Sequence, residues 1–157
     1  MPIGRVLAIH TAPSAGASME THDAIEAIAG RGLAGDRYCE AVGSYSGQRR
    51  PDHERAITLI EAETLDAVRA EHGIDLPSDR TRRNIVTRGI ALNDLVGVTF
   101  RVGEVTLRGV DLAHPCAYLE GLTQPGVLGA LKNRGGVRAE ILTEGTITVG
   151  DQIDVSP

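Results

Sequence analysis

The chain has 157 residues, a length that suits one compact domain with its own hydrophobic core. Hydrophobic residues make up 41% and charged residues 24%, as in an ordinary soluble protein, and no apolar run reaches the ~20 residues that a membrane span needs. A net charge of −5 and an aromatic content of 3% argue against a nucleic-acid partner, which needs cations for its phosphates and rings for its bases. Because the first residues lack the features of a secretory signal, we expect a cytoplasmic protein with no membrane partner.

Hydrophobic patterning divides the first half of the chain into short elements. It predicts strands over residues 4–10, 22–29 and 56–60, and a helix over residues 61–72 that Gly73 ends. Between the second and third strands, residues 30–52 are rich in Gly, Arg and Ser. An irregular loop of this length in a compact domain indicates a functional segment.

The second half of the chain continues with short strands. One is predicted over residues 84–87, and two hairpins follow, residues 99–102 with 105–108 and residues 137–142 with 146–149. A short helix over residues 125–133 begins at a proline and ends before two glycines. Many short strands with two inserted helices favour a closed or half-closed β-barrel over a doubly wound sheet. The sequence therefore predicts a single, mostly β domain over residues 1–157.

The two cysteines, Cys39 and Cys116, are too few for a zinc site and are expected to be free thiols in a cytoplasmic protein. Cys116 follows Pro115 at a break between a predicted strand and a helix, where a thiol can face a pocket. It is either a reactive thiol that nearby arginines hold as thiolate, or a small buried hydrophobic residue. Cys39 has no activating base beside it, and we interpret it as an incidental thiol, with a redox role as the alternative. We expect Cys116 to line a pocket that Cys39 does not share.

Arginine supplies nearly all of the positive charge, because Lys132 is the only lysine, which also makes a Schiff-base mechanism unfavourable. Arg55 stands just before one predicted strand, and Arg82-Arg83-Asn84 begins at the start of another. If these strand starts meet at one mouth of a barrel, their guanidinium groups would surround an anion. The alternative is that they are solvated surface charges.

Residues 32–37, Gly-Leu-Ala-Gly-Asp-Arg, form a glycine-punctuated turn that carries an acid beside a base. The turn lacks the Gly-Lys-Ser/Thr ending and the following helix of a phosphate-binding P-loop, so its residues alone predict a tight turn with a local ion pair. Residues 133–138 could bind an anion through backbone N–H groups or could end the preceding helix, and we favour the helix end.

Five segments, taken in order along the chain, resemble the MOSC family, which is named for the C-terminal domain of molybdenum cofactor sulfurases. The matching segments are residues 32–37, 56–63, 82–86, 115–116 and 145–151, so the resemblance covers most of the chain. It implies a MOSC-type β-barrel with a pocket for the pterin-based molybdenum cofactor, molybdopterin. It also implies that Cys116 either binds molybdenum as thiolate or carries sulfur as a persulfide.

The resemblance extends to the residues around the cofactor. Arg82 and Asn84 match an Arg-x-Asn motif near it, and Arg55 falls just before the strand that helps to hold its phosphate. The residues expected to bind the cofactor, in or beside the matching segments, are Asp36, Arg37, Arg55, Arg82, Arg83 and Asn84.

The larger relatives have a pyridoxal-phosphate desulfurase domain or a second β-barrel that this sequence does not contain. We therefore expect no pyridoxal phosphate here, and sulfur would come from a partner such as a cysteine desulfurase. As an enzyme, the chain would be a molybdenum-dependent reductase of N-hydroxylated or related small substrates with an external electron donor. As a carrier, it would transfer sulfur or hold the cofactor. The alternative, from another class, is a non-catalytic β-barrel binding module in which Cys116 is structural.

Overall fold

Seven strands close into a mixed β-barrel in the computed structural model of the chain, which describes residues 3–47 and 51–155. Around the ring they are β1 (Gly4–Thr11), β6 (Ile85–Arg88), β5 (Ile57–Glu61), β9 (Val137–Ile141), β8 (Val105–Leu112), β7 (Thr99–Val102) and β11 (Gln152–Val155). Pairing of β11 with β1 completes the ring. The neighbours β5 and β6 run parallel, and the other barrel pairs are antiparallel.

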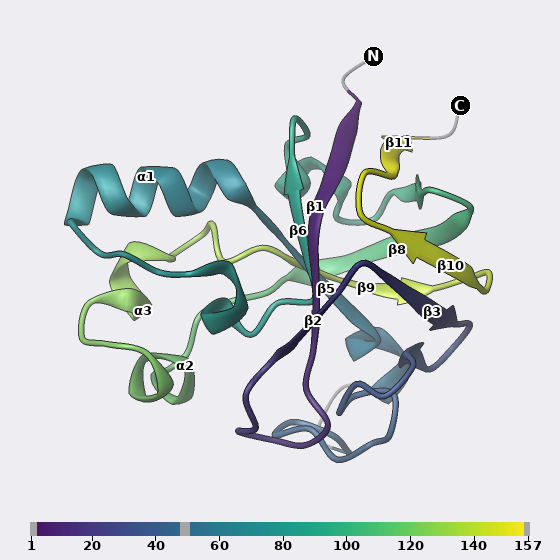
Figure 1. Cartoon of the computed structure of the whole chain (residues 1–157), viewed down its shortest axis with the longest axis horizontal. Helices are drawn as coiled ribbons and strands as arrows, with labels where there is room; N and C mark the ends of the chain where they lie inside the picture. The colour runs from purple at the N-terminus through teal and green to yellow at the C-terminus, as the bar shows by residue number, and fades with distance from the viewer. Residues whose placement is uncertain (1–2, 48–50, 156–157) are drawn as a thin grey trace.

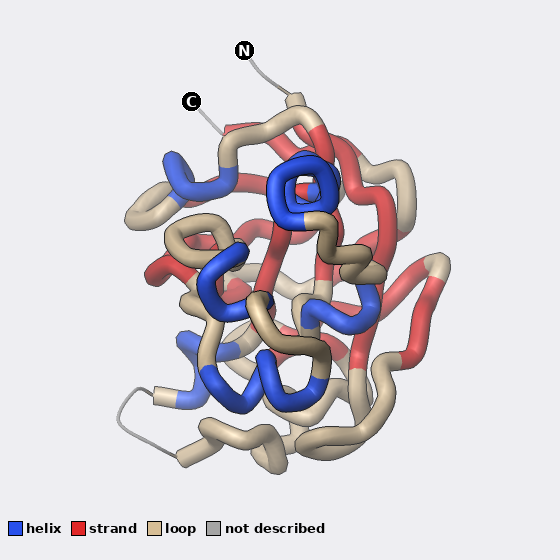
Figure 2. The backbone as a smooth tube through the Cα atoms, turned by 90° about the vertical axis from the view of Figure 1, so that its left-hand side faces the viewer, coloured by secondary structure: helices blue, strands red, loops and turns tan. Residues whose placement is uncertain are grey.

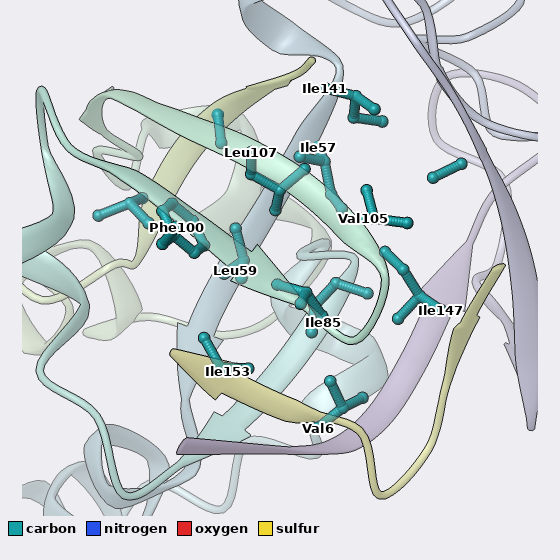
Figure 3. Close-up of a cluster of buried hydrophobic side chains, with 14 of the residues drawn as sticks. Val6, Ile57, Leu59, Ile85, Phe100, Val105, Leu107, Ile141, Ile147 and Ile153 are labelled. Atoms are coloured by element: carbon teal, nitrogen blue, oxygen red, sulfur yellow. The ribbon is translucent and has the colours of Figure 1, made fainter. Parts of the chain in front are cut away.

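The barrel interior is filled by aliphatic side chains that alternate with outward-facing polar ones. In β7, for example, Phe100 and Val102 are buried, whereas Thr99 and Arg101 are exposed. Figure 3 shows the side chains that meet inside the barrel, from strands far apart in the sequence. Ile147 belongs to the same cluster, although its strand β10 (Gly145–Thr148) pairs in a separate sheet with β3 (Ala24–Ile28), which also pairs with β4 (Gly32–Leu33). The short strand β2 (Glu20–His22) lies beside β1.

Three α-helices cover one side of the barrel, α1 (Ala62–His72), α2 (Ala117–Leu122) and α3 (Val127–Ala130). Figure 1 shows them together on the side opposite β3 and β10, and Figure 2 looks onto them. They enclose a second hydrophobic cluster, in which Ile60 and Val86 from the outer faces of β5 and β6 meet Val68 and Leu119. No helix among residues 3–47 and 51–155 is long and apolar enough to cross a membrane.

The barrel predicted from strand spacing is confirmed. The helix over residues 61–72 is present as α1, and the backbone N–H of Gly73, which has a left-handed φ of 67°, donates to the carbonyl of Arg69 and ends the helix. The hairpin of β7 and β8 is also as predicted.

The second predicted hairpin is wrong. Strand β9 pairs with β5 and β8, whereas β10 pairs with β3. Burial is the reason, since Val137, Ala139 and Ile141 face the barrel core between β5 and β8, and a local turn cannot offer the same contacts. The predicted helix over 125–133 is reduced to α3, and α2 and β11 were not predicted. The predicted strand over residues 22–29 is divided at Asp23 between β2 and β3.

Candidate functional site

The segments that precede β5 and β6 lie beside the segments that follow β8 and precede β9. Because β5 and β6 are parallel neighbours, with Leu59 opposite Ile85, their first residues lie at the same rim. Strand β9 is antiparallel to its neighbours, and Leu112 at the end of β8 pairs with Val137 at the start of β9. The 3-10 turns Asp52–Arg55 and Ser78–Thr81 lead into β5 and β6 at this rim. Figure 1 shows the loops that follow β1 and β4, in purple and blue, below the barrel beside α2.

A pocket of about 630 Å³ lies at this rim and carries a concentration of positive charge. Cys116 lines it together with Glu54, and five arginines also line it: Arg37, Arg55, Arg82, Arg83 and Arg138. The chain as a whole has a net charge of −5, whereas the described residues that line the pocket include five arginines and one carboxylate, so positive charge is concentrated there. Cys39 is 4% exposed and does not line the pocket.

Cys116 is placed by the break between β8 and α2. It immediately precedes α2 in an extended conformation and is half-buried. The hydroxyl of Tyr45 donates a hydrogen bond of 3.2 Å to its Sγ atom. This bond, followed by burial, raises the pKa of Tyr45 to about 12, so the hydroxyl remains a donor at neutral pH. The sulfur is therefore accessible from the pocket and has a fixed donor beside it.

Arg83 ties two loops to the rim. Its Nε atom donates to the carbonyl of Gly135 at 2.7 Å, and its Nη2 atom donates to the carbonyl of Ala113 at 2.9 Å. Burial and, next, the positive charge of Arg138 lower the pKa of Arg83 to about 10, which still leaves it cationic at neutral pH. Arg83 thus holds the segment that leads to Cys116 and adds positive charge to the pocket.

Arg82 has an unusual backbone conformation, with a φ of 65° at the end of its 3-10 turn. Its Nη1 atom donates to the carbonyl of Ala17, and its own carbonyl accepts a bond of 3.1 Å from Arg37. Burial and the charge of Arg37 lower the pKa of Arg82. The Arg37 guanidinium is held on its other side by Asp36 at 3.0 Å and stacks 4.9 Å from the ring centre of Tyr38.

Asp36 does not line the pocket. Its fully buried carboxylate accepts bonds from the backbone N–H groups of Ala12 and Tyr38, at 3.0 and 3.3 Å, as well as from Arg37. In this structure its carboxylate therefore orients Arg37.

Asn84 is also absent from the pocket lining, because its amide joins three strands. Its Oδ1 atom accepts from the backbone N–H and the hydroxyl of Thr58, at 3.0 and 3.3 Å, and its Nδ2 atom donates to the carbonyl of His10 at 3.0 Å. The structure thus brings Arg55, Arg82 and Cys116 to one pocket and places the Asn84 side chain beneath it.

Sequence reasoning did not single out Arg138 and Tyr45 as site residues. Arg138 belongs to β9 and faces the rim because its strand pairs with β5, with Arg138 opposite Thr58. Tyr45 lies in the long loop that was interpreted as functional, but 71 positions separate it from its partner Cys116. No local pattern indicates either contact. Among residues 3–47 and 51–155, no group of three or more His, Cys, Asp and Glu side chains is arranged to hold a metal ion.

Comparison with known proteins agrees with this fold. The MOSC domain model matches residues 19–154, and the chain therefore belongs to the MOSC domain family, which is associated with molybdenum cofactor binding. Among solved structures, the YuaD protein from Bacillus subtilis is 16% identical with a TM-score of 0.82, and the alignment covers 99% of this chain and 98% of that one.

Two other solved structures share the fold. YiiM from Geobacillus stearothermophilus is 13% identical with a TM-score of 0.74, over 98% of this chain and 75% of that one. YiiM from Escherichia coli is 17% identical with a TM-score of 0.69, over 98% of this chain and 70% of that one. No curated protein sequence matches the chain.

Proposed function

We propose that the chain binds molybdopterin-type molybdenum cofactor in the arginine-lined pocket, with Cys116 as the sulfur ligand to the metal. The observation that carries the proposal is the pocket itself, in which five guanidinium groups surround the same space as one accessible thiol. The family association with this cofactor supports the same ligand. We place this activity in the cytoplasm.

The pocket residues fit the chemistry of such a ligand. A volume of about 630 Å³ is within the range of roughly 300–1,000 Å³ typical of small-molecule sites. Arg55 and Arg138 line the end of the pocket near Thr58 and would hold the phosphate, since the planar guanidinium fork matches phosphate oxygens. The thiolate of Cys116 is a soft ligand of the kind that transition metals accept.

The bound metal would supply two-electron redox chemistry, for which an external donor must provide the electrons. The protein's own residues would orient the cofactor and shape the site. Tyr45 donates to the sulfur, and Arg83 holds the segments of Ala113 and Gly135 through hydrogen bonds to their carbonyls. The substrates we propose for such an enzyme are N-hydroxylated or related small molecules.

A second candidate function is sulfur carriage on Cys116 as a persulfide. The hydrogen bond from Tyr45 to Sγ favours it, because a donor beside a half-buried sulfur stabilises an anionic sulfur species. This activity needs a cysteine desulfurase or an equivalent sulfur donor as partner. Persulfide-specific labelling after incubation with a desulfurase and cysteine should then mark Cys116 and not Cys39.

The direct test is the molybdenum and pterin content of protein purified from a host that makes the cofactor. We expect both in the wild type, together with loss of molybdenum from Cys116→Ser and retention in the matched control Cys39→Ser. Arg55→Gln should weaken cofactor retention by roughly tenfold or more, the equivalent of one lost hydrogen bond to a charged group. Wild-type protein without molybdenum or pterin would contradict the proposal, as would equal content in Cys116→Ser.

A further inference from the structure

A second, smaller hollow of about 60 Å³ adjoins the pocket at Cys116. All three tyrosines of the chain line it, Tyr38, Tyr45 and Tyr118, although aromatic residues make up only 3% of the sequence. The remaining aromatic residue, Phe100, is buried in the barrel. Two separate parts of the chain, the loop after β4 with Tyr38 and Tyr45 and the helix α2 with Tyr118, therefore bring hydroxyl-bearing rings to one small space beside the sulfur.

The charge around this hollow has one sign. Arg37, Arg82 and Arg83 line it, whereas Arg55 and Arg138 line only the larger pocket. None of the described residues that line the hollow is a carboxylate. Asp36 neutralises part of the charge of Arg37, but the guanidinium groups of Arg82 and Arg83 donate to backbone carbonyls, which carry no net charge. An uncompensated positive potential therefore remains at the hollow.

Size and donor chemistry together select the ligand. A water needs roughly 10–15 Å³ of such space, so a hollow of about 60 Å³ holds a group of only about four to six non-hydrogen atoms. Guanidinium N–H groups only donate hydrogen bonds, and the hydroxyls of Tyr38 and Tyr118 can donate them too, whereas that of Tyr45 donates to Sγ of Cys116. A ligand that accepts from every side, carries negative charge and has this size is a trigonal or tetrahedral oxyanion.

We propose that the hollow is a binding subsite for a small oxyanion, held by Arg82 with the tyrosines around it and separate from the phosphate end of the larger pocket. A ligand there lies next to Sγ of Cys116, since Cys116 lines both spaces. The inference that this subsite holds a substrate or product rests on the proposed function of Cys116. The binding of the anion itself requires no cofactor.

Protection of Cys116 by sulfate tests the subsite in the full-length chain. Iodoacetamide is uncharged and does not compete for the anion site, and peptide mass spectrometry reports the alkylation of Cys116 separately from that of Cys39. We expect sodium sulfate to slow the alkylation of Cys116 in a saturable way, whereas sodium chloride of equal ionic strength does not. Equal effects of the two salts would overturn the proposal.

Matched variants locate the bound anion. Arg82→Gln should raise the sulfate concentration needed for half-protection by roughly tenfold or more. Arg82→Lys keeps the charge but not the planar guanidinium fork, so its half-protection concentration should lie between those of the wild type and of Arg82→Gln. Arg138→Gln, at the far end of the larger pocket, should change it by less than about threefold. If Arg138→Gln weakens protection as much as Arg82→Gln, the anion sits in the larger pocket and the subsite is refuted. That result would leave the molybdenum content of the wild type, and hence the proposed function, unaffected.

Discussion

Replacement of Asn84 by alanine separates a structural role of this residue from direct contact with a cofactor. The side chain is 2% exposed and makes three hydrogen bonds, to Thr58 twice and to the carbonyl of His10. The alanine variant leaves the Thr58 backbone N–H and the His10 carbonyl without these partners inside the protein. Each unsatisfied buried group costs about 1–3 kcal/mol, so we expect the free energy of unfolding to fall by about 2–6 kcal/mol.

Urea denaturation of cofactor-free protein, followed by circular dichroism, measures this loss. The matched control is Asn93→Ala, because Asn93 is exposed and its amide makes one bond, of 2.9 Å, to the carbonyl of Asn133. That change should cost less than about 1 kcal/mol. A free energy of unfolding of Asn84→Ala within about 1 kcal/mol of the wild-type value, together with loss of molybdenum, would contradict this structural role. The amide would then serve the cofactor instead of the barrel.

Three further outcomes follow from particular contacts. Gly136→Ala should prevent folding or destabilise the chain by more than about 3 kcal/mol, because its φ is 100° and the new Cβ would lie 2.0 Å from a backbone oxygen of β5. The control Gly150→Ala has a similar φ of 97° but open space around it, so it should cost only about 1–2 kcal/mol. Similar urea midpoints for the two variants would contradict the predicted clash. The raised pKa of Tyr45 means that the folded state favours its neutral form, so the stability it contributes is present below pH 10 and is lost as the pH rises through about 12. In Cys116→Ala the ultraviolet titration of Tyr45 should move down towards 10. An unchanged titration would refute the hydrogen bond from Tyr45 to Cys116. Iodoacetamide should label Cys116 in the native protein and Cys39 only after unfolding, because burial raises the pKa of the Cys39 thiol and leaves it 4% exposed.

The sequence by itself determined the local features of this protein. Hydrophobic patterning predicted the hairpin of β7 and β8 and the helix α1, and Gly73 predicted where that helix ends. Short strands at regular spacing predicted a barrel, whereas the arginines before two strand starts left an anion site and solvated surface charges as alternatives. The hairpin and the helix each depend on neighbours within a few positions, which periodicity and turn chemistry can report.

Only the tertiary structure decided which distant segments meet. The parallel pairing of β5 and β6 brings Arg55 and Arg82 to one rim, and the pairing of β9 with β5 adds Arg138. Nothing within a strand encodes its partner, which is why a turn-like Glu144-Gly145 predicted a hairpin that the barrel does not form. The choice of partner depends on how much apolar surface each pairing buries across the whole core, and that quantity is a property of the closed barrel and not of any segment.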